Sequence, residues 1–146
     1  ERGLLDQVEI VATDVSQRAL GRARSGVHSR RSLREGHPPE LAAKYLRVAG
    51  EKITIAPTIS AAVRFQCLNL LDRAAVEALG PFDLILCRNV LIYFRDERTQ
   101  QVVKLLTAAL KPGGVLLVGV SESLLRFGTA LVCEERAGSF FYRKEG

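Results

Sequence analysis

One segment, residues 82–94 with the sequence FDLILCRNVLIYF, constrains the fold of this 146-residue chain more than any other. Its apolar run at residues 84–87 has no polar alternation, a pattern typical of a parallel strand that is covered on both faces. Arg88 and Asn89 follow at once, and Tyr93 lies in a second apolar run. Because open α/β sheets bind ligands at the carboxyl ends of their strands, the segment predicts a ligand site that begins at Arg88.

Polar residues with two possible roles end the predicted strands. An arginine between two apolar runs, such as Arg88, is expected near buried surface, where its partner is either a bound carboxylate or a structural aspartate. Asp14 ends a predicted strand at residues 8–13, where an acidic side chain either accepts hydrogen bonds from ribose hydroxyls or stabilises the start of the next helix. Asn69 follows a predicted strand at Val63–Cys67, and its amide suits either an adenine edge or a turn.

Strands and helices alternate along the chain as far as residue 120, which indicates an α/β fold with a mainly parallel sheet. The expected strands lie at residues 8–13, 52–58, 63–67, 82–87 and 115–120, and the expected helices lie at residues 17–25, 40–45, 72–79 and 97–110. Ser16 and Asp96 are expected to cap the first and last of the long helices, and residues 28–39 are expected to form a loop. Residues 131–135 and 139–143 predict an antiparallel hairpin at the edge of the sheet.

Composition favours one cytoplasmic globular domain. Hydrophobic residues make up 47% of the chain and charged residues 25%, and no apolar run reaches the ~18 residues that a membrane helix needs, so no membrane insertion is expected. The cysteines Cys67, Cys87 and Cys133 are odd in number and widely spaced, which indicates reduced thiols of a cytoplasmic protein. No clustered ligands predict a metal site.

The net charge of +5 is concentrated at residues 17–47, where eight basic residues face two acidic ones. Such a stretch is either a solvated helix and loop or a surface for an acidic partner. No aromatic residue lies among these arginines before Tyr45, which argues against a nucleic-acid partner. The chain has no glycine-rich G-x-G segment after any strand and does not begin with Met, so it is expected to be a piece of a longer protein.

Five blocks together resemble the CheR-type chemotaxis receptor methyltransferases, in order and spacing, over nearly the whole chain. They are ATDVS at residues 12–16, NLL at 69–71, CRNVLIYF at 87–94, LKPGG at 110–114 and GVSES at 119–123. The resemblance implies a Rossmann-like class I methyltransferase sheet. It also implies methyl transfer from S-adenosylmethionine to glutamates in the cytoplasmic region of bacterial chemoreceptors, which yields methyl esters and S-adenosylhomocysteine.

The resemblance also implies roles for single residues. Asp14 would bind the ribose hydroxyls, and Asn69 and Leu70 would contact the adenine. Arg88 and Asn89 would bind the methionine part of the cofactor. Two catalytic roles are expected at the reacting carboxylate, where Arg88 would steer it and Tyr93, in the same block, would donate a hydrogen bond.

The chain departs from the family pattern at its start. Family members carry an N-terminal helical domain and then a glycine-containing first strand and loop, and the chain begins after both. Residues 1–146 are therefore expected to form a partial methyltransferase domain that lacks a central strand, binds S-adenosylmethionine weakly alone and self-associates through unpaired strand edges. Residues 45–63 match a reduced β-subdomain insertion. The alternative function is a non-catalytic, methyltransferase-like module that binds a partner in a signalling protein.

Overall fold

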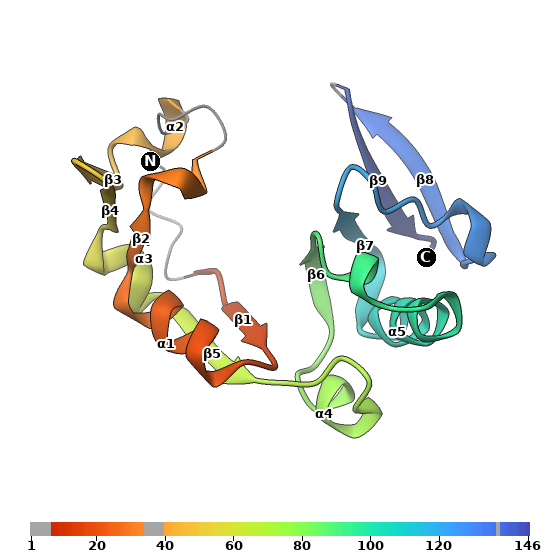
Figure 1. The fold of residues 1–146 in the computed structure, drawn as a ribbon. Helices are drawn as coiled ribbons and strands as arrows, with labels where there is room; N and C mark the ends of the chain where they lie inside the picture. Colours follow the sequence, from red (N-terminus) through yellow and green to blue (C-terminus); the bar gives the residue numbers. More distant parts are fainter. Residues whose placement is uncertain (1–6, 34–39, 137) are drawn as a thin grey trace. The chain divides into compact units, whose positions relative to one another are not determined.

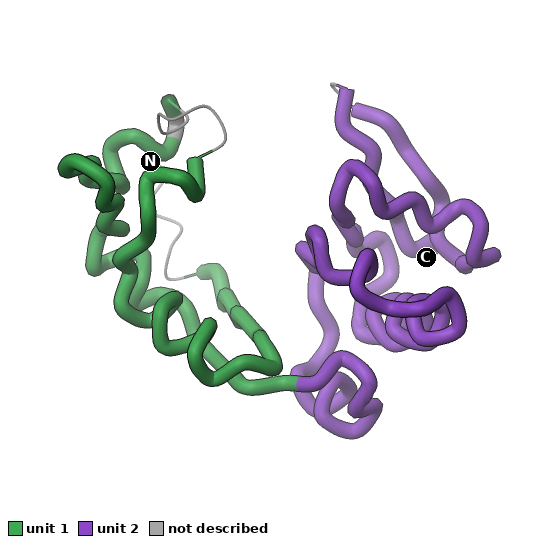
Figure 2. The backbone as a smooth tube through the Cα atoms, in the orientation of Figure 1, with its two compact units in different colours: residues 1–68 green, residues 69–146 purple. Residues whose placement is uncertain are grey.

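The computed structural model describes residues 7–33, 40–136 and 138–146. The chain divides into two compact units, Glu1–Leu68 and Asn69–Gly146, shown in green and purple in Figure 2. Each unit contains both helices and strands, as the labels in Figure 1 show, so the predicted α/β architecture is confirmed. Among the described residues, parallel and antiparallel strand pairs both occur.

The first unit contains a parallel strand pair. Strand β1 (Ile10–Asp14) lies beside β5 (Val63–Cys67), with Asp14 opposite Cys67 at their carboxyl ends. The polypeptide between them begins with helix α1 (Gln17–Ser25), which packs against both strands. Parallel pairing between β1 and β5 agrees with the strand–helix alternation of the sequence.

The predicted ends of α1 are confirmed because both are set by local chemistry. Ser16 is the N-cap, and its side-chain oxygen accepts a hydrogen bond from the backbone N–H of Ala19 at 3.2 Å. Gly26 ends the helix with φ 62°, in the left-handed region that glycine adopts without strain. Leu20 is the buried residue of the helix.

The first unit also holds a small antiparallel sheet in the order β2-β4-β3. Its strands are β2 (Val27–Ser29), β3 (Leu46–Ala49) and β4 (Lys52–Ile55). The predicted loop is wrong at its start, where β2 and the 3₁₀ helix η2 (Arg30–Ser32) form; residues 34–39 of that loop lie outside the described residues. Strand β2 could not be predicted from its local sequence, because its hydrogen-bond partner, β4, is more than twenty residues away in sequence.

Two short helices flank the β3–β4 hairpin. Helix α2 (Glu40–Ala43) lies where a helical turn was expected. The strand expected at residues 52–58 ends earlier, because Pro57 begins helix α3 (Pro57–Ala61). Proline favours the first helical position, where its missing N–H costs no hydrogen bond.

The second unit is built on a four-stranded sheet in the order β6-β7-β9-β8. Strand β6 (Phe82–Cys87) runs parallel to β7 (Leu110–Val118), and β9 (Ser139–Lys144) pairs antiparallel with β7. The predicted C-terminal hairpin is confirmed, with β8 (Leu131–Arg136) at the edge of the sheet. Helix α4 (Arg73–Glu77) precedes β6.

Helix α5 (Asp96–Ala108) covers one face of this sheet, as Figure 1 shows. The core beneath it consists of apolar side chains from the helix, from all four strands of the sheet and from the segments that join them: Cys87, Leu91, Val102, Val103, Leu106, Leu110, Leu116, Leu124, Leu131 and Tyr142. On the opposite face Leu84 is 52% exposed and Leu86 is 65% exposed. The expectation that β6 is covered on both faces is therefore wrong within this unit.

Strands β1 and β6 are both edge strands of their sheets within the described residues. Among the residues that the structure describes, β1 pairs only with β5, and β6 pairs only with β7. The unpaired side of each strand presents backbone N–H and C=O groups that an added strand would satisfy.

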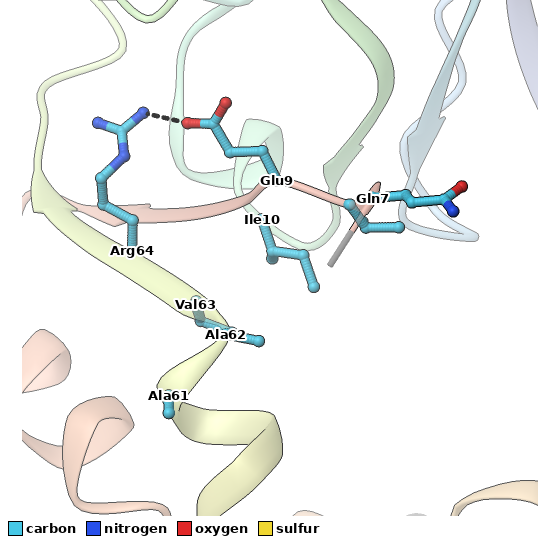
Figure 3. Close-up of a pocket in the computed structure, with 8 residues that line it drawn as sticks. Gln7, Glu9, Ile10, Ala61, Ala62, Val63 and Arg64 are labelled. Carbon is cyan, nitrogen blue, oxygen red and sulfur yellow. Dashed lines mark hydrogen bonds and ion pairs between the residues drawn. The ribbon is translucent and has the colours of Figure 1, made fainter. Parts of the chain in front are cut away.

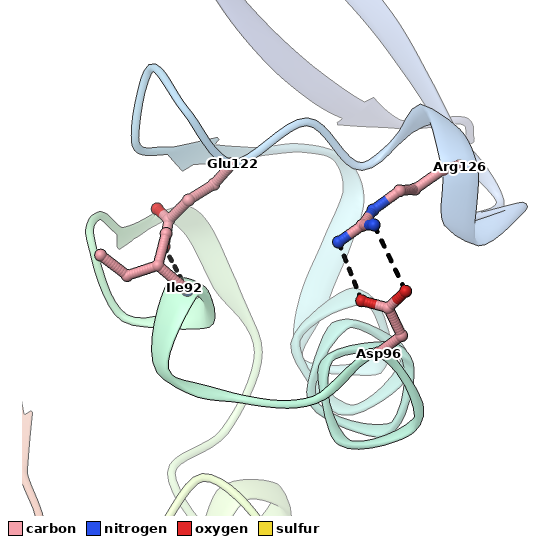
Figure 4. A network of polar contacts seen from close by, with 4 residues as sticks. All are labelled: Ile92, Asp96, Glu122 and Arg126. Carbon is pink, nitrogen blue, oxygen red and sulfur yellow. Dashed lines mark hydrogen bonds and ion pairs between the residues drawn. The ribbon is translucent and has the colours of Figure 1, made fainter.

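Asp96 does not cap helix α5 as expected. It is the first helical residue, and Arg95 holds the N-cap position without a side-chain hydrogen bond. The Asp96 carboxylate instead pairs with the guanidinium of Arg126, with nitrogen–oxygen distances of 2.9 and 3.3 Å (Figure 4). This pair ties the segment after β7 to the start of α5, where a negative charge also favours the helix dipole.

The buried phenol of Tyr142 generates a prediction about stability. Its oxygen accepts a hydrogen bond from the backbone N–H of Leu124 at 2.9 Å, and the two residues are 4% and 0% exposed. Tyr142→Phe leaves that N–H unpaired and is expected to lower the free energy of unfolding by about 1–3 kcal/mol, measured by urea denaturation. Tyr93→Phe, at an 82% exposed position, is the matched control and is expected to leave the unfolding midpoint unchanged. Equal midpoints for both variants would contradict this role of Tyr142.

Candidate functional site

The candidate site begins where β6 ends, at a sharp backbone bend. Asn89 has φ 58° and is the one non-glycine residue with a positive φ among those described. This left-handed conformation costs most residues about 1–2 kcal/mol, and asparagine is one of the few non-glycine residues that adopt it. The chain then forms the 3₁₀ helix η3 (Leu91–Tyr93), so the bend directs the polypeptide away from the sheet.

The three site residues on this segment are all exposed. Arg88 directly precedes the bend, Asn89 begins it, and both side chains are exposed. The side chain of Tyr93 is 82% exposed. The expectation that Arg88 lies near buried surface is not met among the described residues, because Cys87 occupies the inward position and Arg88 follows it outside. A bound carboxylate as the partner of Arg88 stays a prediction. Within the part of the chain that the structure describes, the Arg88 guanidinium has no hydrogen-bond or ion-pair partner. It is therefore available to a carboxylate.

A buried carboxylate, that of Glu122, holds the bend in place. Its Oε2 atom accepts hydrogen bonds from the backbone N–H of Asn89 at 2.7 Å and of Gly119 at 2.6 Å. Its Oε1 atom accepts a third from the N–H of Ile92 at 3.1 Å, drawn as a dashed line in Figure 4. Glu122 is 5% exposed, so these donors replace the water that the carboxylate loses.

The hydrogen bonds keep Glu122 ionised despite its burial. Burial by itself raises the pKa of the carboxyl, but backbone N–H groups, chiefly those of Asn89, Gly119 and Ile92, hold the pKa below its usual value. The lowered pKa means that the ionised Glu122 carboxylate stabilises the folded state. This contribution to stability is complete above the pKa that Glu122 has in the unfolded chain, and it is lost as the pH falls through the lower pKa of the folded state.

Gly119 makes this arrangement possible by its small size. A Cβ atom at this position would lie 2.5 Å from Oε2 of Glu122 and 3.1 Å from the backbone nitrogen of Asn89. Gly119 does not have a positive φ, so the requirement is for space rather than for backbone freedom. The sequence marked residues 121–123 only as a polar loop or crevice lining, and no local signal distinguishes Glu122 from an exposed loop glutamate.

The other predicted binding residues make local contacts. Oδ1 of Asp14 accepts a hydrogen bond from the N–H of Ser16 at 2.7 Å, and Oδ1 of Asn69 accepts one from the N–H of Leu71 at 3.0 Å. Both side chains are exposed, and within the described residues Oδ2 of Asp14 and the amide nitrogen of Asn69 have no partner. The turn role of each is thus observed, and each keeps a polar group for a ligand.

These residues are divided between the two units. Asp14 belongs to the first unit, and the others belong to the second: Asn69, Leu70, Arg88, Asn89 and Tyr93. Leu70 is partly buried and packs against the core of the second unit. The structure brings Arg88, Asn89 and Tyr93 together on one segment. The exposed guanidinium, amide and phenol groups of this segment suit the amine and carboxylate groups of S-adenosylmethionine. In the first unit, the free oxygen of Asp14 suits ribose hydroxyls.

Two hollows lie outside this set of side chains. The larger, of about 490 Å³, is lined by residues at the amino ends of β1 and β5, including Ile10, Val63 and Arg64 (Figure 3). Asp14 is at the opposite end of β1, so this hollow is not the predicted site. The smaller, of about 160 Å³, lies between η3, α5 and the segment after β7, and Glu122 and Thr99 line it.

Within residues 7–33, 40–136 and 138–146, no three His, Cys, Asp or Glu side chains are grouped so that they would hold a metal ion. Over the same residues, no helix is both long enough and apolar enough to cross a membrane.

The cysteines provide a test of the buried environment behind the site. Burial, and secondly the charge of Glu122, raises the pKa of the Cys87 thiol from 9.0 to about 11, whereas Cys67 is exposed. The raised pKa lowers the thiolate fraction of Cys87 at pH 8 about a hundredfold. A thiol reagent is therefore expected to modify Cys67 first and Cys87 only after unfolding, as located by peptide mass spectrometry. Cys67→Ser is expected to remove the fast phase, and fast labelling of Cys87 in the folded chain would contradict its burial.

Comparison with known families identifies a match over almost the whole chain. The family described as "CheR methyltransferase, SAM binding domain" matches residues 2–136. A chemotaxis protein methyltransferase of Vibrio parahaemolyticus is 41% identical over 123 residues, which are 84% of this chain and 44% of the relative. A chemotaxis protein methyltransferase of Pseudomonas aeruginosa is 41% identical over 118 residues, 80% of this chain and 42% of the relative. The chain thus spans less than half the length of these relatives.

Other similarities concern pathway and fold. A probable biofilm formation methyltransferase of Pseudomonas aeruginosa is 36% identical over 80% of this chain and 28% of its own length. The structure of the N-methyltransferase NodS from Bradyrhizobium japonicum, solved with S-adenosyl-L-homocysteine, matches 93% of this chain and 66% of its own, with a TM-score of 0.56 and 18% identity. At that identity the match establishes a shared methyltransferase-like fold alone.

Proposed function

This chain belongs to the CheR methyltransferase family, in its SAM-binding domain, and on that premise we propose that the protein methylates glutamate side chains of bacterial chemoreceptors. The substrate region is the cytoplasmic part of a methyl-accepting receptor, and the product is a glutamate methyl ester. The observation that carries the proposal is the segment after β6, which presents Arg88, Asn89 and Tyr93 on a bend held by Glu122. The proposal includes a cytoplasmic location, because the receptor region is cytoplasmic.

The reaction does not require a general base. A glutamate side chain has an unperturbed pKa of about 4.3 and is already a nucleophilic anion at pH 7. S-adenosylmethionine, when bound, supplies a methyl group on a positively charged sulfur and leaves as S-adenosylhomocysteine after that methyl has bonded to the carboxylate oxygen. The protein's task is therefore to align two reactants and to exclude water.

Arg88 and Tyr93 are the side chains proposed to act on the carboxylate. The Arg88 guanidinium is a permanent cation with paired donors that match a carboxylate, and it has no partner among the described residues. Tyr93 offers one phenolic donor from the same segment. Both donate hydrogen bonds that orient the carboxylate, so that one of its oxygens faces the methyl group.

The cofactor would be held by groups at the ends of three strands. Asp14, after β1, has a free carboxylate oxygen for the ribose hydroxyls, and Asn69, after β5, has a free amide nitrogen for the adenine edge. Leu70 adds an apolar contact to the adenine. Arg88 and Asn89, after β6, serve the methionine part.

A further strand is part of the proposal. We propose that the free edges of β1 and β6 are both filled in the protein as its gene encodes it, by a glycine-containing strand and loop. In support, each edge is unpaired within the described residues, and Leu84 and Leu86 are more than half exposed on β6. Residues 1–146 are on this view a partial methyltransferase domain, and residues 45–63, which contain the β3–β4 hairpin, are its reduced β-subdomain.

The alternative is a non-catalytic, methyltransferase-like module that binds a partner in a signalling protein. The coding sequence before Glu1 discriminates between the two functions. A glycine-bearing strand and loop there favours the enzyme, and its absence favours the module. The biofilm relative indicates that family membership alone does not specify chemotaxis as the pathway.

The function is tested with the protein as its gene encodes it, a chemoreceptor cytoplasmic fragment and S-adenosylmethionine that carries a labelled methyl group. Label is expected on receptor glutamates and is expected to be released by base, as methyl esters are. A receptor with alanine at the labelled positions is the control. The absence of base-labile label, with the protein folded, would contradict the proposed activity.

Tyr93→Phe tests the role of the phenol. The substitution removes one hydrogen bond to a charged group, worth about 1.5–3 kcal/mol, so the methylation rate is expected to fall about tenfold or more. Tyr45→Phe, outside the proposed site, is the matched control and is expected to keep the full rate. An unchanged rate for Tyr93→Phe would remove Tyr93 from the mechanism.

The chain alone tests the proposed additional strand. Titration calorimetry of residues 1–146 with S-adenosylhomocysteine is expected to show weak or undetectable binding, because on this proposal a further strand and loop hold the methionine part. Sedimentation of the same chain is expected to show self-association through the free strand edges. Tight binding by the isolated, monomeric chain would contradict both expectations.

A further inference from the structure

Glu122 connects two segments that are 30 residues apart in sequence. It accepts hydrogen bonds from Asn89 and Ile92 after β6 and from Gly119 at the end of β7. Within the described residues no cation pairs with it, so backbone N–H groups alone satisfy this buried carboxylate. Because each backbone N–H points in a fixed direction, the Glu122 carboxylate holds the backbone segments that donate to it in a fixed arrangement.

The donors lie next to the residues that face the ligand. The N–H of Asn89 belongs to the residue with φ 58°, and the N–H of Ile92 belongs to the 3₁₀ turn that carries Tyr93. Arg88 precedes the first donor directly. The position of the carboxylate therefore fixes the backbone on both sides of the three exposed site residues.

We infer that Glu122 is a positioning residue of the methyl-transfer site, which holds the backbone of residues 88–93 in the conformation that presents Arg88, Asn89 and Tyr93. The inference rests on the proposed function for its effect on cofactor binding. Its effect on the segment itself does not depend on that function. Glu122 does not contact the ligand, because it is 5% exposed and its oxygens face the protein backbone.

Independent support comes from Gly119, at which any side chain would displace the carboxylate. A Cβ there would approach Oε2 of Glu122 to 2.5 Å. Gly119→Ala thus provides a second variant, which keeps the Glu122 carboxylate and its N–H donors but displaces the carboxylate from them. Gly21 is its control, because a Cβ at Gly21 meets nothing within 4 Å and its φ is not positive.

The test uses Glu122→Gln in the protein as its gene encodes it, with Glu134→Gln as the matched control. Glutamine has nearly the same shape, but its amide group turns a donor toward at least one backbone N–H. Glu134 is also a carboxylate of the second unit, and it pairs with Arg143 at the half-exposed β8–β9 ladder, away from the bend. Amide hydrogen exchange and titration with S-adenosylhomocysteine are measured for each variant.

Exchange at Asn89 and Ile92 is expected to rise at least tenfold in Glu122→Gln, with little change at Tyr142 in the sheet. Affinity for S-adenosylhomocysteine is expected to fall at least tenfold, while Glu134→Gln keeps the affinity of the unsubstituted protein. Exchange that rises equally throughout the sheet, or affinity within twofold of the unsubstituted protein, would overturn the inference. If Glu122→Gln does not fold, Gly119→Ala against Gly21→Ala gives the same readings.

The two proposals fail in different ways. An unsubstituted protein that binds no S-adenosylhomocysteine would refute the proposed function, and the exchange at Asn89 and Ile92 would still decide whether Glu122 orders the segment. Normal binding by the unsubstituted protein with equal binding by Glu122→Gln would refute the positioning role alone.

Discussion

The hydrogen bonds of the Glu122 carboxylate hold together the strand ends of the second unit at which the candidate site lies. A buried charge is stable only with full compensation, and removal of one partner of such a group costs about 1–3 kcal/mol or more. Here the compensation comes from N–H groups at the ends of two parallel strands, β6 and β7. The same hydrogen bonds that satisfy the charge therefore join the strand ends and retain the left-handed bend at Asn89. The apolar core beneath, with α5 against the sheet, fixes the strands from which this bend projects.

Much of the fold could be predicted because its signals are local. Helix α1 has the predicted bounds, since Ser16 and Gly26 define its ends by their own chemistry, and the C-terminal hairpin follows from alternation around a turn. Strand β2 could not be predicted, because its pairing with β4 is non-local and it is only three residues long. The apolar run of β6 indicated a strand correctly, but it carries no information about which helices cover each face.

The candidate site could likewise be predicted only where its sequence signals are local. Arg88, Asn89 and Tyr93 were found from sequence because they lie in one block at the end of an apolar strand. The exposure of Arg88 and the contacts of Glu122 were not found. Glu122 is more than thirty residues from Asn89, and its burial depends on the small size of Gly119 and on how two strands end together. A polar residue after a strand is readable from sequence, but its hydrogen-bond partners are not.

The proposed site supplies alignment rather than acid–base chemistry, and the central claim is that Glu122 holds residues 88–93 in the conformation that binds the methionine part of the cofactor. A crystal structure of the protein as its gene encodes it, with S-adenosylhomocysteine, tests this claim most directly. The expected result is a Glu122 carboxylate hydrogen-bonded to the N–H groups of Asn89 and Ile92, with the homocysteine end of the ligand at residues 88–93. A Glu122 side chain without these hydrogen bonds, or a ligand bound away from residues 88–93, would contradict the claim.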